Sequence, residues 1–206
     1  EDEFGNADLI HETVKKIAHR EGIGDLLAEG VARAHEELGV ENWSVKGMEF
    51  AAHDGRAING QGFSYAVANR GGDHMYSTTL RVEYDGEIDP IGLDGKPAVV
   101  LDRENRAAIR DSGIICAFGE DDYVTQDVIE TLFDADYDDM LAIGARVIEL
   151  ERHFNNKRGM DREDDTLPYE LPDFEAALDE YYELRGWNDD GTVPDSQVST
   201  YAVADD

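Results

Sequence analysis

The chain has almost no cysteine. Cys116 is the single one among 206 residues. One thiol cannot form a disulfide within the chain, so a framework of cross-links is excluded. Because free cysteines are among the most buried residue types, composition alone favours a buried Cys116 over a reactive one.

The sequence also lacks a long apolar run. A membrane-spanning helix needs about 20 consecutive apolar residues, and no stretch of the chain approaches that length. The first residues, EDEFGNADL, do not have the pattern of a signal peptide. We therefore expect a globular cytoplasmic protein with no membrane as a partner.

Basic residues are scarce as well. The chain has 18 basic and 48 acidic residues, for a net charge of −30. Nucleic-acid binding depends on Lys and Arg that displace counterions from phosphates, so nucleic acid is excluded as a partner. The acidic residues are dispersed rather than gathered in one tail, which favours adaptation to a salt-rich, halophilic cytoplasm over an acidic interaction tail.

Hydrophobic residues recur at helical spacing over most of the chain, and this predicts a mainly α fold. The predicted helices, with the residues expected to face the core, are 7–21 (Ile10, Val14, Ile17, Ala18), 24–39 (Leu26, Leu27, Val31, Ala34), 103–110, 126–133, 137–153 (Met140, Ile143, Val147, Leu150) and 173–185. Asp102 and Thr125 are expected to cap the third and fourth helices, and Gly39 and Gly186 to end the second and the last.

The middle of the chain has a different character. Residues 40–101 are rich in glycine and contain Pro90 and Pro97, which predicts loops, short helices and a hairpin near residues 79–90. Residues 188–206 are polar and lack helical periodicity, so we expect a loosely held acidic tail.

One short loop in this region groups polar side chains. Arg70 and His74 flank two glycines and an aspartate in the sequence RGGDH. Paired glycines allow a backbone to approach a ligand closely, which favours a binding loop, and an ordinary surface turn explains the same residues equally well. The role of His53 stays undecided, and His11, His19 and His35, on predicted helices, are expected to be solvated.

The second candidate segment is DSGIIC, from Asp111 to Cys116. A thiolate there could act as a nucleophile with His74 as its base. It could also be one ligand of a metal or iron–sulfur site, which normally needs four thiolates. The spacing leaves both interpretations open. Residues 154–168, taken alone, indicate only a charged connection.

Together, five segments resemble the C-terminal part of the tungsten-containing aldehyde:ferredoxin oxidoreductase family. They occur in the family's order between Ala18 and Trp187: REGIGDLLAEGVARA, VKGMEFAAHDGRAINGQGFSYAVANRGGDH, DSGIIC, LERHFNNKRGMDREDDTLP and YYELRGW. Members of this family oxidise aldehydes to carboxylic acids and pass the electrons to ferredoxin. They use a tungsten (or molybdenum) bis-pterin beside a [4Fe–4S] cluster.

The resemblance assigns roles to individual residues. DSGIIC is similar to the family's second D-x-x-G-L-C motif, which implies that Asp111 and the backbone at Ile115 meet the pterin and that Cys116 is the last of four cluster thiolates. Ile114 stands where the family usually has Gly, and Gly113 could compensate. His74 resembles the catalytic histidine beside the metal, and Arg70 is implied to position the His74 loop against the cofactor.

The family's other three cluster cysteines, its first pterin motif and its N-terminal β domain have no counterpart in this chain. The resemblance therefore implies a helical remnant of the middle domain over 1–45, a helical C-terminal domain over 46–187 and the tail over 188–206. It also implies that the chain is inactive without the N-terminal region of the enzyme.

Two other functions compete with this interpretation. A helical binding or assembly module could have kept the fold without the chemistry, although such a module has no need of Asp111, His74 and Cys116 together. A Cys–His hydrolase would need a thiol activated by a nearby base, and no known cysteine signature surrounds Cys116.

The charge of the chain generates a first prediction. Thermal unfolding should shift to higher temperature between low and molar KCl, because salt screens the repulsion among the carboxylates. Calorimetry at the two salt concentrations measures this shift. An unchanged melting temperature would contradict salt adaptation.

Overall fold

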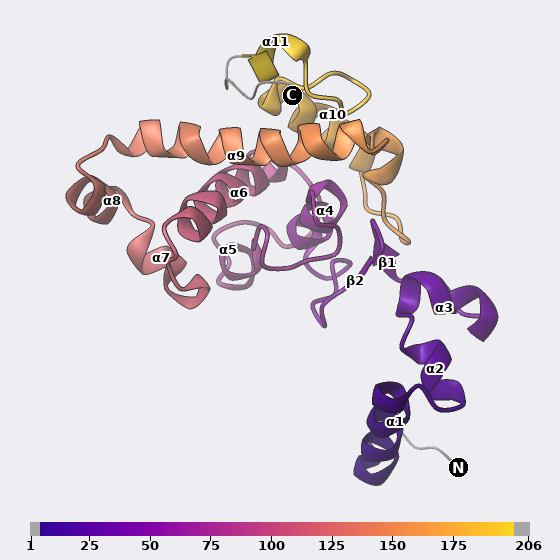
Figure 1. Cartoon of the computed structure of the whole chain (residues 1–206). Coiled ribbons are helices and arrows are strands. Elements are labelled where there is room, and N and C mark those ends of the chain that lie inside the picture. Colours follow the sequence, from indigo (N-terminus) through magenta and orange to yellow (C-terminus); the bar gives the residue numbers. More distant parts are fainter. Residues whose placement is uncertain (1–4, 200–206) are drawn as a thin grey trace.

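The computed structural model describes residues 5–199 and is mainly α-helical, as predicted (Figure 1). The α-helices are α1 (Ala7–His19), α2 (Ile23–Leu27), α3 (Val31–Leu38), α4 (Asn59–Val67), α5 (Leu80–Tyr84), α6 (Lys96–Ser112), α7 (Glu120–Tyr123), α8 (Gln126–Phe133), α9 (Tyr137–Lys157), α10 (Phe174–Arg185) and α11 (Asp195–Val198). Two 3₁₀ turns, η1 (Ala117–Gly119) and η2 (Arg162–Asp164), and a hairpin of β1 (Ser44–Val45) and β2 (Met48–Glu49) complete the described part. No helix within it is long and apolar enough to cross a membrane.

Four helices form the body of the molecule. The long helices α6 and α9 lie against each other, and α4 and α10 pack on α6 (Figure 1). The backbones of α6 and α9 approach so closely at Gly144 that a Cβ there would lie 2.2 Å from the carbonyl oxygen of Asn105. The core between the helices is aromatic, with Phe63 from α4 and the ring of Tyr181 from α10 both fully buried.

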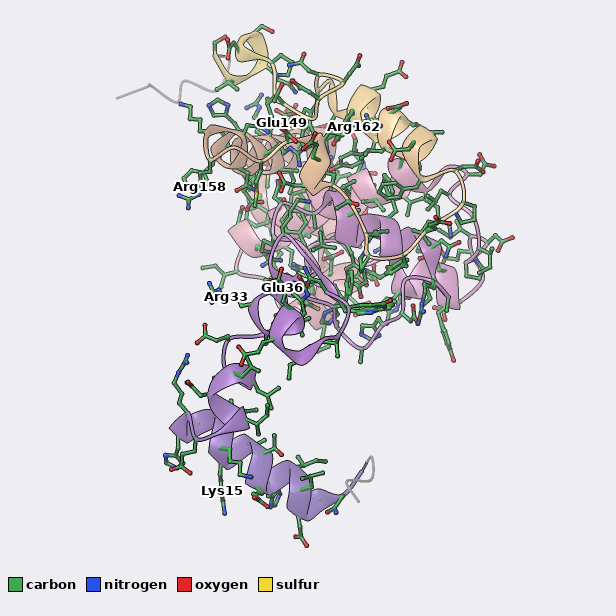
Figure 2. The ribbon with its side chains drawn as sticks, turned by 90° about the vertical axis from the view of Figure 1, so that its right-hand side faces the viewer. Lys15, Arg33, Glu36, Glu149, Arg158 and Arg162 are labelled. Atoms are coloured by element: carbon green, nitrogen blue, oxygen red, sulfur yellow. The ribbon has the colours of Figure 1, made fainter. Side chains whose placement is uncertain are left out.

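The first three helices extend away from this body (Figures 1 and 2). The prediction that Ile10 and Val14 of α1 face the core is therefore wrong, because Ile10 is 52% exposed and Val14 is 58% exposed. Helix α1 packs against α2, and neither view shows another helix beside it. The second predicted helix is split in two by Gly30, whose φ of +79° cannot belong to a right-handed helix.

The hairpin predicted at residues 79–90 is also wrong. Residues 80–84 form the short helix α5, and the hairpin of the structure lies at residues 44–49 instead. The cause is Glu83, which is buried and accepts hydrogen bonds from the backbone N–H groups of Gly60 and Gln61 at the start of α4. Lys96 reaches the same carboxylate, with its Nζ 2.5 Å from Oε1.

Helix boundaries differ from the predictions in two more places. Asp102 is not a cap, because α6 already begins at Lys96 with Pro97 in its first turn, where the missing N–H of proline costs no hydrogen bond. Thr125 precedes α8 as predicted, but its side chain makes no capping hydrogen bond. Gly39 and Gly186 end their helices with left-handed φ angles, as predicted.

The C-terminal segment is held more firmly than its composition suggested. Val193 is buried in the core, and Val198 packs against the same cluster from α11. The amide Nε2 of Gln197 donates to Glu149 of α9 over 2.7 Å. The expectation of a loose tail is therefore wrong for residues 188–199, and residues 200–206 lie outside the described part.

A buried carboxylate, Asp165, joins the separate segments. Its Oδ1 lies 2.6 Å from Nζ of Lys46 in the hairpin, and both of its oxygens accept hydrogen bonds from Arg152 of α9 at 2.9 and 2.8 Å. The hydroxyl of Tyr182 in α10 donates to it as well. Burial acts to raise the pKa of Asp165, but the two cations outweigh it and lower that pKa.

The Asp165 cluster generates a stability prediction. Asp165→Asn should lower the free energy of unfolding by about 3–5 kcal/mol at neutral pH, because it leaves two buried cations without a counter-charge. Since the folded-state pKa is lowered, the contribution of the carboxylate is present above about pH 4 and is lost as the pH falls further.

Urea unfolding at pH 7 measures the effect. The matched control is Glu180→Gln, which removes one negative charge from an exposed position on α10. Equal unfolding midpoints for the two variants would contradict the role given to Asp165.

Candidate functional site

The loop with His74 rests on the hairpin. Gly71 has a φ of +91°, and a Cβ there would lie 2.2 Å from the carbonyl oxygen of Val45. A Cβ on Gly72 would lie 2.9 Å from the carbonyl oxygen of Met48 and 3.2 Å from the ring of Phe50. The paired glycines thus allow the loop to pack against the protein's own backbone, which is a structural reason for their presence.

His74 lies beside a second imidazole. Its ring centroid is 5.0 Å from that of His53, with an angle of 56° between the ring planes. His74 is half-buried and His53 is exposed. The sequence alone does not assign a role to His53, because nothing along the 20 residues between His53 and His74 shows that the two rings meet.

Arg110 of α6 connects the His74 loop with Asp111. Its side chain is buried, its Nε donates to Oδ1 of Asp111 over 2.8 Å, and its Nη2 donates to the carbonyl of Met75 over 3.1 Å. Glu120 supplies the counter-charge through Nη1. One guanidinium therefore fixes the residue after His74 and the carboxylate of Asp111 relative to each other. The sequence analysis missed Arg110, since an arginine next to an aspartate is ordinary in this chain.

Arg70 and Asp111 line one small hollow of about 80 Å³. Arg70 is held by an ion pair with Asp73 at 2.9 Å and by the ring of Tyr76, which lies 5.0 Å from its guanidinium carbon. The Asp111 side chain is 59% exposed. A guanidinium and an accessible carboxylate on one hollow are a donor and an acceptor suited to a pterin, whose amino and ring nitrogens donate hydrogen bonds.

The buried end of this hollow is formed by Glu104 of α6. One of its oxygens accepts from Tyr181 and from Arg185, and the other, Oε1, has no hydrogen-bond partner among the described residues. Burial raises the pKa of Glu104, against the opposing effect of the Arg185 charge.

The turn after Asp111 depends on Ile114. Ile114 adopts a φ of +56° and is 94% exposed, whereas Gly113 has an ordinary φ of −83°. Gly113 therefore does not take over the left-handed conformation that the family's glycine would favour. The Ile115 side chain packs against the buried cluster of Ile109, Val124 and Ile129, which leaves its backbone rather than its side chain for the implied pterin contact.

Cys116 follows at the surface. It is an exposed free thiol that precedes η1, so the buried position favoured by composition is wrong. Across residues 5–199, no three or more His, Cys, Asp or Glu side chains are grouped so as to hold a metal ion. Cys116 is the single thiol of the chain, whereas an iron–sulfur cluster normally needs four thiolates.

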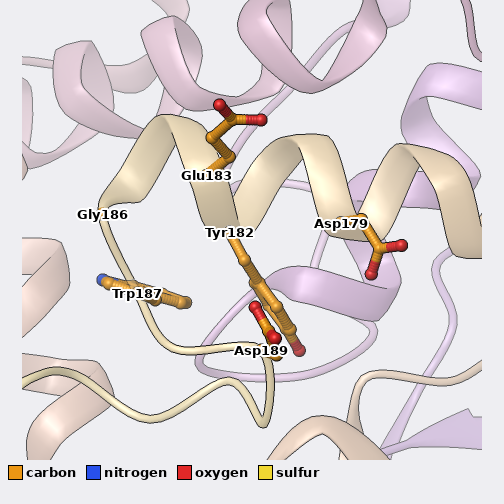
Figure 3. Close-up of a pocket in the computed structure, with 6 residues that line it drawn as sticks. All are labelled: Asp179, Tyr182, Glu183, Gly186, Trp187 and Asp189. Atoms are coloured by element: carbon orange, nitrogen blue, oxygen red, sulfur yellow. The ribbon is translucent and has the colours of Figure 1, made fainter.

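Another hollow, of about 610 Å³, lies at the end of α10 (Figure 3). Its lining includes Asp179, Glu183 and Asp189 beside the rings of Tyr182 and Trp187. None of the candidate site residues Arg70, His74, Asp111, Ile115 and Cys116 lines it, so the size of this hollow does not make it the functional site.

Comparison with known proteins gives one consistent family. The profile described as "Aldehyde ferredoxin oxidoreductase, domains 2 & 3" matches residues 1–201. The tungsten-containing aldehyde ferredoxin oxidoreductase of Pyrococcus furiosus is 35% identical over 98% of the chain and 38% of its own length. The enzyme of the same name from Pyrococcus horikoshii is 36% identical over 95% of the chain and 36% of its own length.

A solved structure supports the fold. The active-site complex BamBC of benzoyl coenzyme A reductase has a TM-score of 0.69 at 20% identity and covers 96% of this chain and 39% of its own. At that identity the likeness shows the fold alone.

The helical fold and the profile match together define a C-terminal portion of an oxidoreductase. The chain belongs to the aldehyde ferredoxin oxidoreductase family and corresponds to its domains 2 and 3. It spans little more than a third of the length of these relatives, at 38% and 36%.

The Arg110 bridge generates a prediction about local mobility. Arg110→Lys keeps the charge but loses the forked contacts to Asp111 and Met75, so the backbone amides of residues 70–76 should exchange with solvent about tenfold faster. Hydrogen–deuterium exchange measures this rate. The matched control, Arg33→Lys, alters a side chain that is 77% exposed on α3 and should leave the loop unchanged. Equal exchange in both variants would contradict the bridge.

Proposed function

We propose that this chain is the helical C-terminal part of an enzyme that oxidises aldehydes to carboxylic acids with ferredoxin as the electron acceptor. The observation that carries the proposal is the Arg110 bridge, which brings the His74 loop and Asp111 together in a chain of this family. The overall reaction converts an aldehyde and water into a carboxylic acid, two protons and two electrons.

Asp111 and Arg70 are the residues that would hold the pterin. The accessible carboxylate of Asp111 would accept hydrogen bonds from the pterin's amino and ring nitrogens, while Arg110 fixes its orientation from behind. Arg70, on the same hollow, would donate to pterin oxygens. When bound, the tungsten (or molybdenum) bis-pterin supplies the two-electron oxidation.

His74 is the proposed catalytic residue. An imidazole can donate or accept a proton near neutral pH, and a position beside the substrate oxygen would suit that task. The glycines and the hairpin hold the His74 loop in place, and His53 lies against the His74 ring. The role of His53 would be to fix that ring and to border the substrate.

Cys116 is the proposed ligand of the [4Fe–4S] cluster. Its thiol is accessible, and three further thiolates would have to come from the N-terminal region of the enzyme. The chain alone would then be inactive, because one thiolate cannot hold the cluster.

The exposed apolar residues fit contact with that N-terminal region. Ile114 and Phe118, on either side of Cys116, are 94% and 93% exposed, and the extended α1 leaves Val14 uncovered. Burial of such surface would contribute roughly 25 cal/mol per Å² to association of the parts.

The helical remnant of the middle domain proposed for residues 1–45 would end at the last residue of β1.

The proposal is tested in the whole enzyme with two variants that should fail differently. Cys116→Ser should lower bound iron and remove the electron paramagnetic resonance signal of the reduced cluster. Asp111→Ala should instead lower the pterin content while the cluster persists, because its part is hydrogen bonding and not iron ligation. Both should reduce aldehyde-dependent dye reduction at least tenfold.

The matched control is Asp122→Ala, at an exposed position on α7, which should retain iron, pterin and activity. If Cys116→Ser kept its iron and its activity, Cys116 would be an ordinary surface thiol. If the unaltered enzyme oxidised no aldehyde, the proposed reaction would be wrong.

A further inference from the structure

An aromatic hollow lies beside the His74 loop. It has a volume of about 220 Å³ and is lined by residues from three segments: Trp43, residues 50–55 and Tyr169. Drug-sized ligands need about 300–1,000 Å³. The hollow is therefore of a size for one ring or a branched aliphatic group.

The aromatic walls hold one another in position. The rings of Trp43 and Tyr169 stack with centroids 5.6 Å apart and an interplanar angle of 28°. Phe50 packs against both, with its centroid 6.2 Å from Trp43 and 5.9 Å from Tyr169. Such contacts between rings are favourable beyond the area they bury. The walls are thus ordered before any ligand arrives, which reduces the entropy cost of binding.

Two polar groups around the hollow, the indole N–H of Trp43 and the carboxylate of Asp54, are already paired, whereas the buried hydroxyl of Tyr169 has no hydrogen-bond partner among the described residues. The indole N–H of Trp43 donates to Glu41 over 3.1 Å, and the guanidinium of Arg56 lies 4.9 Å from the Trp43 ring. Asp54, the carboxylate on the wall, accepts three hydrogen bonds from the Arg56 side chain, and these lower its pKa. The hollow therefore suits an uncharged apolar group.

His53 connects the hollow to the proposed reacting group. It lines the hollow, and its ring meets that of His74 at 5.0 Å. Phe50 forms another connection, because the backbone of the His74 loop at Gly72 rests on its ring. An aldehyde whose CHO group is next to His74 would have the hollow within reach of its side chain.

We infer that the aromatic hollow binds the side chain of the aldehyde and selects substrates with an aromatic or similarly bulky apolar group over short aldehydes. This inference rests on the proposed function. Each methylene that a pocket recognises is worth roughly 10–200-fold in kcat/KM. We therefore expect kcat/KM for phenylacetaldehyde to exceed that for acetaldehyde at least tenfold.

Substrate kinetics of the whole enzyme provide the first test. Trp43→Ala should lower the ratio of kcat/KM for phenylacetaldehyde to that for acetaldehyde about tenfold, through the KM of the aromatic substrate. The matched control is Phe154→Ala on α9, an aromatic residue that is 61% exposed and does not line the hollow. The control should leave the ratio unchanged.

The outcomes separate the two proposals. An enzyme that oxidises neither aldehyde would contradict the proposed function. An enzyme that oxidises both equally well, or a ratio unmoved by Trp43→Ala, would contradict the aromatic hollow while leaving aldehyde oxidation in place.

Tryptophan fluorescence of this chain gives a second readout that needs no cofactor. The chain has two tryptophans, and Trp187 is buried in the core away from the hollow. Titration with 2-phenylethanol, an uncharged analogue, should change the emission saturably, whereas ethanol at the same concentrations should not. The change should be lost in Trp43→Phe. A response that does not saturate, or one that persists in Trp43→Phe, would overturn the assignment.

Discussion

The arrangement of this chain depends on one buried carboxylate with two cationic partners. Asp165 holds Lys46 of the hairpin and Arg152 of α9 at the same point, with Tyr182 of α10 as a third donor. Burial of any one of these charges alone would be strongly unfavourable. The three segments must therefore come together in one geometry, and the hairpin is fixed to the helical body by the same contact.

That contact extends to the candidate site. The hairpin that Lys46 anchors supports Gly71 and Gly72, and α9 reaches the loop from its other side, where Asn155 donates to the carbonyl of Asn69 over 2.9 Å. The His74 loop is thus held between two elements that Asp165 joins. Its shape follows from this packing together with contacts within the loop, such as the hydrogen bond from the backbone N–H of Met75 to Asp73 and the ion pair of Arg70 with Asp73.

The sequence predicted the long elements and missed the long-range pairs. Helices α9 and α10 were predictable because their apolar residues repeat at helical spacing and Gly186 marks an end. Helix α5 was not predictable from its own sequence, because Lys96, which pairs with the buried Glu83, lies 13 residues further along the chain. The sequence around Asp165 indicates only a charged connection, since in so acidic a chain nothing local distinguishes a buried carboxylate from a solvated one. The candidate roles of His74, Asp111 and Cys116 come from the family resemblance, whereas the contacts of His53 and Arg110 needed coordinates.

The turn at Ile114 places a branched residue in a left-handed backbone conformation. A left-handed backbone costs a branched residue roughly 1–2 kcal/mol, yet Ile114 adopts it with its side chain in solvent. A glycine at position 114 could adopt the same φ without that cost. A comparison by residue type therefore records a difference at position 114, while the backbone there has a conformation that glycine adopts readily.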